Sequence, residues 1–216
     1  MNTLWTFGDS FTFGAGCRPD GPVYLPTGPS TEYYNNYKNS LDDIFPELLG
    51  KMLNLKVKNF GCSAVSNDYI IDSIIDNWDY IKEGDCVIIQ ITWHGRFDIP
   101  YDGKLESPYF YEDYLNGFPL YKKEEIETII NFQYHFANNK LYKFRYLKRF
   151  NFLYKLLKEK KIKTHLWDVT DFIASKKFEK IFDATNGKIG DEHFSFKGHR
   201  NFAEMMYKKI TNPTLI

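Results

Sequence analysis

The chain has 216 residues, with 28 Lys and Arg against 28 Asp and Glu, so its formal net charge is +0. This length fits one domain, and the neutral charge argues against nucleic acid as the main partner, because neutralising phosphates needs a basic excess. The sequence holds no run of about 18–20 apolar residues, which excludes a membrane-spanning helix, and its start lacks the basic and apolar regions of a secretory signal.

Short apolar runs alternate with helical patterns along the chain. In chain order, we predict a strand over 4–7, a helix over 41–53, a strand over 55–60, a helix over 69–80, a strand over 86–91, a helix over 141–158, a strand over 162–167 and a helix over 197–210. The third strand is almost wholly apolar, which is typical of a central strand covered on both faces. Such alternation predicts an α/β protein with a parallel sheet between two layers of helices.

The helix predicted over 141–158 combines apolar and basic residues. An apolar residue recurs every three or four positions, at Leu141, Phe144, Leu147, Phe150, Leu153 and Leu157. Lysines and arginines occupy the positions between them, and acidic segments elsewhere balance their charge. We therefore interpret the basic side as a solvated helix face rather than a site for nucleic acid or an anionic surface.

The connection between the third and fourth strands is far longer than a usual βα loop. We predict a single domain over 1–216 with an aromatic-rich insertion around 98–161. The first part of this insertion is dense in rings, at Tyr101, Tyr109, Phe110, Tyr111, Tyr114, Phe118 and Tyr121. These rings either form a cap or groove edge over the strand ends or bury against the sheet.

Polar residues follow the predicted strands, where ligands bind in parallel sheets. The sequence Gly-Asp-Ser stands at residues 8–10 after the first strand, Gly61 ends the second, and a polar and aromatic segment over 92–98 follows the third. Near the C-terminus, Asp191 stands two residues before His193, where a carboxylate can hold an imidazole in one tautomer.

Neither metal coordination nor a disulfide framework fits this pattern. His193 and His199 are six residues apart, which is not the i,i+4 spacing that places two imidazoles on one helical face. The three cysteines, Cys17, Cys62 and Cys86, form no CxxC pair. We expect no metal and no cofactor, reduced thiols, and a cytoplasmic location by default.

These blocks, in this order over essentially the full chain, resemble the SGNH (GDSL-type) hydrolase family. The resemblance implies a three-layer α/β/α sandwich with a flavodoxin-like parallel sheet of five strands. It also implies that Ser10 is the nucleophile, that His193 is the general base, and that the N–H groups of Ser10 and Gly61 belong to the oxyanion hole.

The chain departs from the family pattern at two points. The Asn that usually supplies a third oxyanion donor is replaced by His94, which is our substitute, with Thr92 and Arg96 as alternatives. The usual Asp lies three residues before the His, where this chain has Gly190. Asp191 is therefore our orienting residue, and a Ser–His dyad assisted by a backbone carbonyl is the alternative.

The resulting hypothesis is a serine esterase that acts through an acyl-enzyme, with an O-acyl (acetyl) group on a carbohydrate as the first choice of substrate. Lipid or short-chain esters remain open as substrates. The alternatives are a catalytically silent glycan-binding or structural module and an O-acyltransferase. We expect a small-molecule or glycan ester as partner and neither nucleic acid nor a membrane; the sequence leaves the oligomeric state open. The residues expected to contact the substrate are Asp9, Asn67, Thr92, Trp93 and Arg96.

Overall fold

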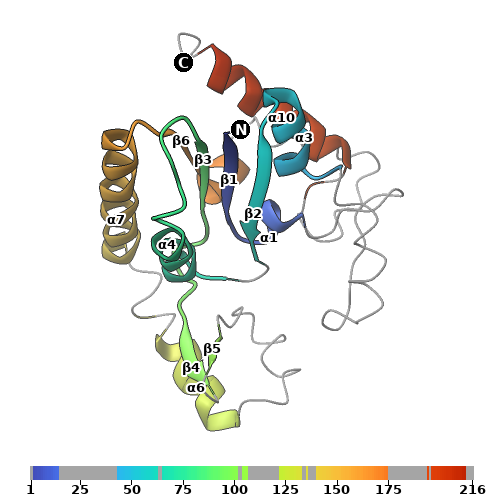
Figure 1. Cartoon of the computed structure of the whole chain (residues 1–216). Coiled ribbons are helices and arrows are strands. Elements are labelled where there is room, and N and C mark those ends of the chain that lie inside the picture. Colours follow the sequence, from blue (N-terminus) through green and yellow to red (C-terminus); the bar gives the residue numbers. More distant parts are fainter. Residues whose placement is uncertain are drawn as a thin grey trace.

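The computed structural model describes residues 2–14, 43–62, 65–101, 104–106, 122–132, 135, 140–174, 194 and 196–212 (Figure 1). Its main sheet has the strand order β2-β1-β3-β6, and every pairing in it is parallel. The strands are β1 (Thr3–Gly8), β2 (Lys56–Gly61), β3 (Cys86–Ile91) and β6 (Lys163–Asp168). The predicted parallel α/β fold is confirmed; the described residues contribute four strands to the sheet, against the five expected.

Helices cover both faces of this sheet, so the fold has three layers (Figure 1). One face carries α3 (Phe45–Leu53), α8 (Val169–Ala174) and α10 (Phe196–Thr211). The other face carries α4 (Asn67–Asp76) and α7 (Lys140–Glu159). Each face therefore has a hydrophobic core of its own.

The two cores follow from the alternation of side chains along each strand. Leu4 of β1 lies in the core under α3 and α10, and its neighbour Trp5 lies in the core under α4 and α7. Every residue of β3 is buried, as expected for a central strand. At the edge of the described sheet, β2 keeps Lys56 and Lys58 exposed, and the Lys58 ammonium lies 4.2 Å from the centre of the Trp5 ring.

The buried side of α7 differs from the predicted stripe in its first half. Leu141 is 75% exposed and Phe144 is 55% exposed, whereas Tyr146 is buried and donates from its hydroxyl to Asp68 of α4 at 2.7 Å. The side chains of α7 that are buried are Tyr146, Phe150, Leu153 and Leu157. A tyrosine with a carboxylate partner therefore takes the core position that apolar spacing alone assigns to its neighbours.

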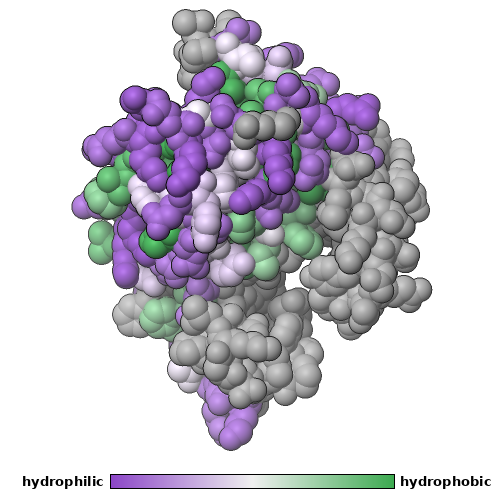
Figure 2. All heavy atoms as spheres, in the orientation of Figure 1, coloured by the Kyte–Doolittle hydropathy of each residue, from purple (hydrophilic) through white to green (hydrophobic). Residues whose placement is uncertain are grey.

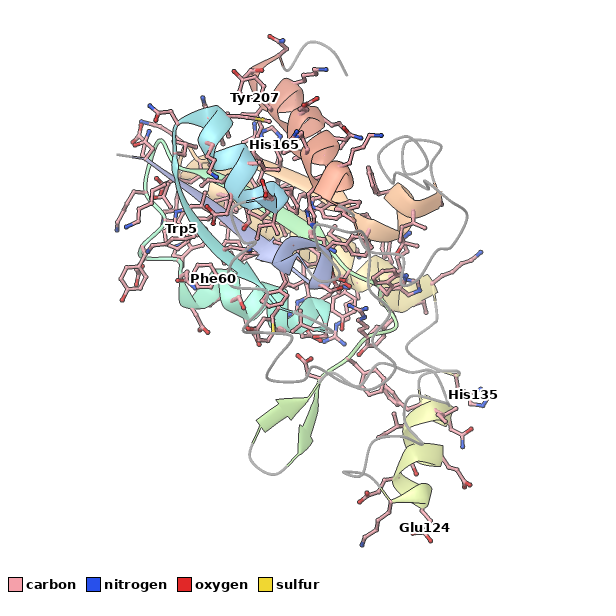
Figure 3. All side chains as sticks on the ribbon, turned by 90° about the vertical axis from the view of Figure 1, so that its right-hand side faces the viewer. Trp5, Phe60, Glu124, His135, His165 and Tyr207 are labelled. Atoms are coloured by element: carbon pink, nitrogen blue, oxygen red, sulfur yellow. The ribbon has the colours of Figure 1, made fainter. Side chains whose placement is uncertain are left out.

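Part of the long insertion projects from the end of the sheet at which α1 (Ser10–Phe13) lies (Figure 1). It contains an antiparallel hairpin of β4 (Ile99–Tyr101) and β5 (Lys104–Glu106), followed by α6 (Lys123–Phe132). In the turned view, Glu124 of α6 lies well away from Trp5 in the sheet (Figure 3). The rings over 109–121 lie outside the described residues.

Hydrophilic residues dominate the described surface in the view of Figure 2, with hydrophobic side chains scattered among them. Within the described part of the chain, none of the helices has the length and apolar character needed to cross a bilayer.

Candidate active site

The polar residues singled out in the sequence gather where β1 and β3 end. These strands are adjacent in the sheet although β2 lies between them in the chain, so their carboxyl ends flank a topological switch point. Such a point is where ligands bind in open α/β sheets. Ser10 lies there, because β1 ends at Gly8 and the four-residue helix α1 begins at Ser10. The serine is 5% exposed.

Asp9 connects β1 to α1 and is fully buried. Its Oδ1 accepts the backbone N–H of Phe11 at 3.0 Å, as a helix N-cap does, and also the side-chain amide of Gln90. Its Oδ2 accepts the Thr92 hydroxyl at 2.5 Å and Nη1 of Arg96 at 2.9 Å. A carboxylate offers about four lone-pair positions, and these four donors fill them. Asp9 therefore joins α1 to β3 and to the turn after it, and no acceptor position of its carboxylate is left for a substrate.

Gln90 lies in the middle of the buried strand β3 and links it to α1. Its Oε1 accepts the backbone N–H of Asp9 at 3.3 Å and the Thr12 hydroxyl at 2.5 Å. The close approach depends on Gly8, because a Cβ at that position would lie 2.2 Å from Thr12 Oγ1 and 2.5 Å from Gln90 Oε1. The glycine of the Gly-Asp-Ser sequence thus has a packing role here.

Gly61 ends β2 beside Gly8 of β1, and its N–H has a partner within the protein. That N–H donates to Asn59 Oδ1 at 2.9 Å, while Asn59 Nδ2 donates to the Thr12 carbonyl at 3.0 Å. A Cβ at Gly61 would lie 2.3 Å from the backbone N of Phe13, so the glycine allows β2 to approach α1. The hydrogen bond to Asn59 occupies the N–H that the resemblance assigns to the oxyanion hole.

Asn67 and Thr92 bind each other rather than facing solvent. Asn67 Nδ2 donates to the Thr92 carbonyl at 3.0 Å, and the Thr92 N–H donates to Asn67 Oδ1 at 2.9 Å. Both residues are buried. This reciprocal pair joins the Asn67 side chain, in the first residue of α4, to the Thr92 backbone at the end of β3. The Thr92 hydroxyl binds Asp9, so both side chains act as structural links rather than as substrate contacts.

The chain turns sharply after β3, where the Arg96 N–H donates to the Trp93 carbonyl at 3.1 Å. Trp93 is half-buried, its ring centre is 6.0 Å from that of Phe11, and the Arg96 guanidinium lies 4.7 Å from its ring centre. His94 is half-buried in the same turn. Trp93 and His94 are therefore the predicted site residues of this turn that keep exposed surface.

The C-terminal segment reaches the same place. Phe194, which follows His193 in the sequence, is buried with its ring centre 5.0 Å from that of Phe11, in an edge-to-face arrangement. The next histidine, His199, is the fourth residue of α10; it is buried and accepts the Phe45 N–H on Nδ1 at 3.1 Å, which fastens α10 to α3. That histidine is part of the framework.

Asp191 and His193 themselves lie outside the described residues, so their predicted roles stay predictions. Among the residues that the structure does describe, no three His, Cys, Asp or Glu side chains gather as a metal site would require. The two cysteines within this part of the chain, Cys62 and Cys86, form no disulfide.

Sequence reasoning missed Gln90 and Asn59, which join the segments around Ser10. Gln90 is the one polar side chain in an otherwise apolar buried strand, and such a residue needs buried partners. Asn59 lies in β2, and its Oδ1 also accepts the Thr6 hydroxyl of β1 at 3.0 Å. A lone amide in a strand that is to be covered on both faces is the signal for Gln90, whereas Asn59 lies in an edge strand beside exposed lysines and gives no such signal.

Neither family models nor curated protein sequences match this chain. Solved structures with a similar shape include a member of the lipolytic protein G-D-S-L family from Veillonella parvula, at 16% identity, with full coverage of both chains and a TM-score of 0.41. A lipase/acylhydrolase from Enterococcus faecalis is 13% identical over 99% of this chain and 97% of its own, with a TM-score of 0.41. A carbohydrate esterase family 2 enzyme from Corynascus thermopiles (Myceliophthora fergusii) is 14% identical over 97% of this chain and 65% of its own, with a TM-score of 0.45. At scores this low, the shared shape assigns no function to this chain.

Proposed function

We propose that this chain is a serine esterase of the SGNH (GDSL-type) family, with Ser10 as its nucleophile. The observation that carries the proposal is the ring contact between Phe11 and Phe194. These two residues are the sequence neighbours of Ser10 and His193. Adjacent Cα atoms are about 3.8 Å apart, so a contact between the neighbours supports a proton transfer between the proposed nucleophile and base.

In the proposed reaction, Ser10 attacks an ester carbonyl while His193 takes the hydroxyl proton. Asp191 keeps the imidazole in the orientation that this transfer needs. His193 then returns the proton to the leaving alcohol, and the same residue activates a water molecule that hydrolyses the acyl-enzyme. Every proton in this scheme moves between Ser10, His193, the alcohol and water, so the chemistry needs no cofactor.

We propose the Ser10 N–H and the His94 side chain as donors to the oxyanion. Gly61 is a weaker choice than the resemblance suggests, because its N–H is engaged by Asn59. The Thr92 hydroxyl and Nη1 of Arg96 both bind Asp9. We keep His94 as a donor because of its position in the turn after β3, where the resemblance places the third donor. In this role, His94→Ala should lower kcat by about 10²–10³ and change KM little. Unchanged turnover in this variant would remove His94 from the oxyanion hole.

For the substrate we propose an O-acetyl group on a carbohydrate. Two features support this choice: Trp93 offers a half-buried ring near Ser10, and the insertion projects from the same end of the sheet. The insertion is anchored there by a ring contact of 4.7 Å between Phe97, after β3, and Phe132 of α6. Aromatic faces suit stacking on sugar rings and also suit an acyl pocket. Acetate release from an acetylated polysaccharide, compared with turnover of p-nitrophenyl butyrate, separates these two substrate classes.

The test of the esterase itself uses p-nitrophenyl acetate and a fluorophosphonate that phosphonylates activated serines. We expect turnover by the native chain, complete loss in Ser10→Ala, and labelling that maps to Ser10 by mass spectrometry. Ser73→Ala is the matched control, because Ser73 lies within α4 and is none of the proposed catalytic or binding residues, so its loss should leave turnover unchanged. Equal turnover in the native chain and Ser10→Ala would overturn the proposal.

Two observations favour a catalytically silent glycan-binding module as the second candidate. Ser10 is almost fully buried and the Gly61 N–H is engaged within the protein. A silent module would bind an acetylated glycan without releasing acetate and would not react with the fluorophosphonate. An O-acyltransferase would instead be labelled at Ser10 and would pass the acyl group to an added sugar in preference to water.

A further inference from the structure

Arg96 is a charged side chain in an unusual place, because it is 5% exposed and lies directly behind the segment that carries Ser10. Charged side chains are rarely buried unless they are paired. The guanidinium is covered on one side by the Trp93 ring, at 4.7 Å from the ring centre. The remaining contacts of the guanidinium show what compensates for the burial of its charge.

A single nitrogen of this guanidinium reaches three separate segments. Nη1 lies 2.9 Å from Asp9 Oδ2 after β1, 3.0 Å from Thr92 Oγ1 after β3, and 3.5 Å from the Val65 carbonyl before α4. These are the ends of the chain segments that converge on the topological switch point. Arg96 consequently fixes their positions relative to one another.

The charge of Arg96 is matched by that of Asp9, with which it forms a buried ion pair. Asp9 in turn caps α1 through the Phe11 N–H, so the pair acts on the backbone on either side of Ser10. Loss of one partner would leave the other charge buried and uncompensated, whereas loss of both would not. Arg96 acts on Ser10 through Asp9, with no need to touch a substrate.

We propose that Arg96 is a positioning residue that holds Ser10 in its reactive geometry through Asp9, Thr92 and Val65. This inference rests on the proposed function and replaces the expectation that Arg96 binds the substrate. A positioning role lowers kcat and the rate at which Ser10 is phosphonylated, because a small displacement of the nucleophile is costly. A substrate contact raises KM instead.

The test compares Arg96→Gln, Arg96→Lys, Asp9→Asn and the double variant Asp9→Asn/Arg96→Gln with the native chain. For Arg96→Gln we expect kcat for p-nitrophenyl acetate and the phosphonylation rate of Ser10 to fall about 10- to 100-fold, with KM nearly unchanged. Arg96→Lys keeps the charge and should recover part of the loss. If the two substitutions acted independently, the fold-loss of the double variant would equal the product of the fold-losses of Arg96→Gln and Asp9→Asn. We expect the double variant to react about 5-fold faster than this product predicts, because it leaves no unpaired buried charge.

Arg149→Gln is the matched control, since it removes an ion pair with Asp68 that lies between α7 and α4 and is partly exposed. This control should react like the native chain. A rise in KM with unchanged kcat in Arg96→Gln would make Arg96 a substrate contact and overturn the inference. Unchanged phosphonylation in Arg96→Gln would overturn it as well.

Hydrogen exchange separates failure of this inference from failure of the proposed function. In the structure the Phe13 N–H donates to the Asp9 carbonyl and the Gly14 N–H donates to the Ser10 carbonyl, both at 2.9 Å. In Arg96→Gln these two amides should exchange faster, while the amides of α7 should not. Equal protection of Phe13 and Gly14 in the variant and the native chain would refute the positioning role, even if the native chain proves unreactive toward the fluorophosphonate.

Discussion

Phe194 offers the sharpest test of whether the C-terminal segment sets the reactivity of Ser10. Its buried ring makes edge or tilted contacts with four other rings, those of Phe11, Phe172, His199 and Phe202. Phe194→Leu keeps most of the apolar volume and removes these contacts. Each is worth about 0.5–1.5 kcal/mol and they are not additive, so we expect a loss of about 2–3 kcal/mol in the free energy of unfolding.

Phe45→Leu is the matched control for this variant. Phe45 is equally buried, and its ring packs in the same core against Trp167, His199 and Phe202. Its loss should cost a similar free energy of unfolding, about 2 kcal/mol. Phe45 begins α3, whereas Phe194 lies against the residue that follows Ser10.

The assay combines urea denaturation with the rate of phosphonylation at Ser10. Phe194→Leu should slow phosphonylation about 10-fold, because the residue next to His193 loses its anchor on Phe11. Phe45→Leu should stay within about 2-fold of the native rate, since this change leaves that anchor in place. Equal slowing in both variants would show that general destabilisation sets the rate, and no slowing in either would refute the reasoning that links the ring contact to catalysis.

Gly61→Ala should lower the free energy of unfolding by about 1–3 kcal/mol in urea denaturation, because the new Cβ would meet the backbone of α1. A denaturation midpoint equal to that of the native chain would contradict the close approach of β2 to α1. Burial raises the pKa of the Cys86 thiol to about 12. At pH 8 iodoacetamide should therefore modify Cys86 only after denaturation, and modification of the native protein would refute this. Burial, with a smaller effect from nearby lysines, lowers the pKa of His165 to about 4, against about 6.5 in an unfolded chain. As the pH falls, His165 is protonated in the unfolded state before it is protonated in the folded state, and this favours unfolding. The free energy of unfolding is therefore unaffected by His165 above pH 6.5 and falls by about 1–2 kcal/mol toward pH 4, a range reduced to allow for solvent around the partly exposed ring. His165→Gln should lose less stability than the native chain between pH 7.5 and pH 4.5, and an equal loss would assign the effect to other groups.

The strands could be predicted closely because their apolar runs are short and end at glycines or charged residues. The run over 86–91 coincides with β3, and the runs over 4–7 and 55–60 differ from β1 and β2 by a residue at each end. Helix boundaries were harder to predict. The helix expected over 69–80 begins earlier, at Asn67, because Ser66 accepts the Tyr69 N–H at 3.1 Å as an N-cap.

That helix also ends earlier than expected, at Asp76. The Asn77 side chain donates to the Ser73 carbonyl at 2.8 Å, and the residues that follow form turns. Periodicity alone extends a helix across such a stop, because apolar residues such as Ile81 continue the pattern while being buried in the core from a loop.

For the site, the sequence located the important residues but not what each one does. Asp9, Asn67, Thr92 and Arg96 were expected to touch a substrate, and the structure pairs them with each other in a buried network. Spacing along the chain cannot show this, because the Asn67–Thr92, Asp9–Thr92 and Asp9–Arg96 pairs join residues 25, 83 and 87 positions apart. Residue type predicts that polar groups will gather at the strand ends; only the fold decides which of them point inward.

The exposed lysines of β2 bear on how copies of this chain behave at high concentration. An edge strand offers unpaired N–H and C=O groups that a strand from a second copy can join, which is a route to aggregation. Lys56 and Lys58 lie on the edge of the described sheet, and a joining strand would have to strip water from both ammonium groups. The residues that supply the exposed positions of the alternating pattern of β2 thus oppose edge-to-edge pairing, and replacing them with valine should lower solubility by favouring such pairing.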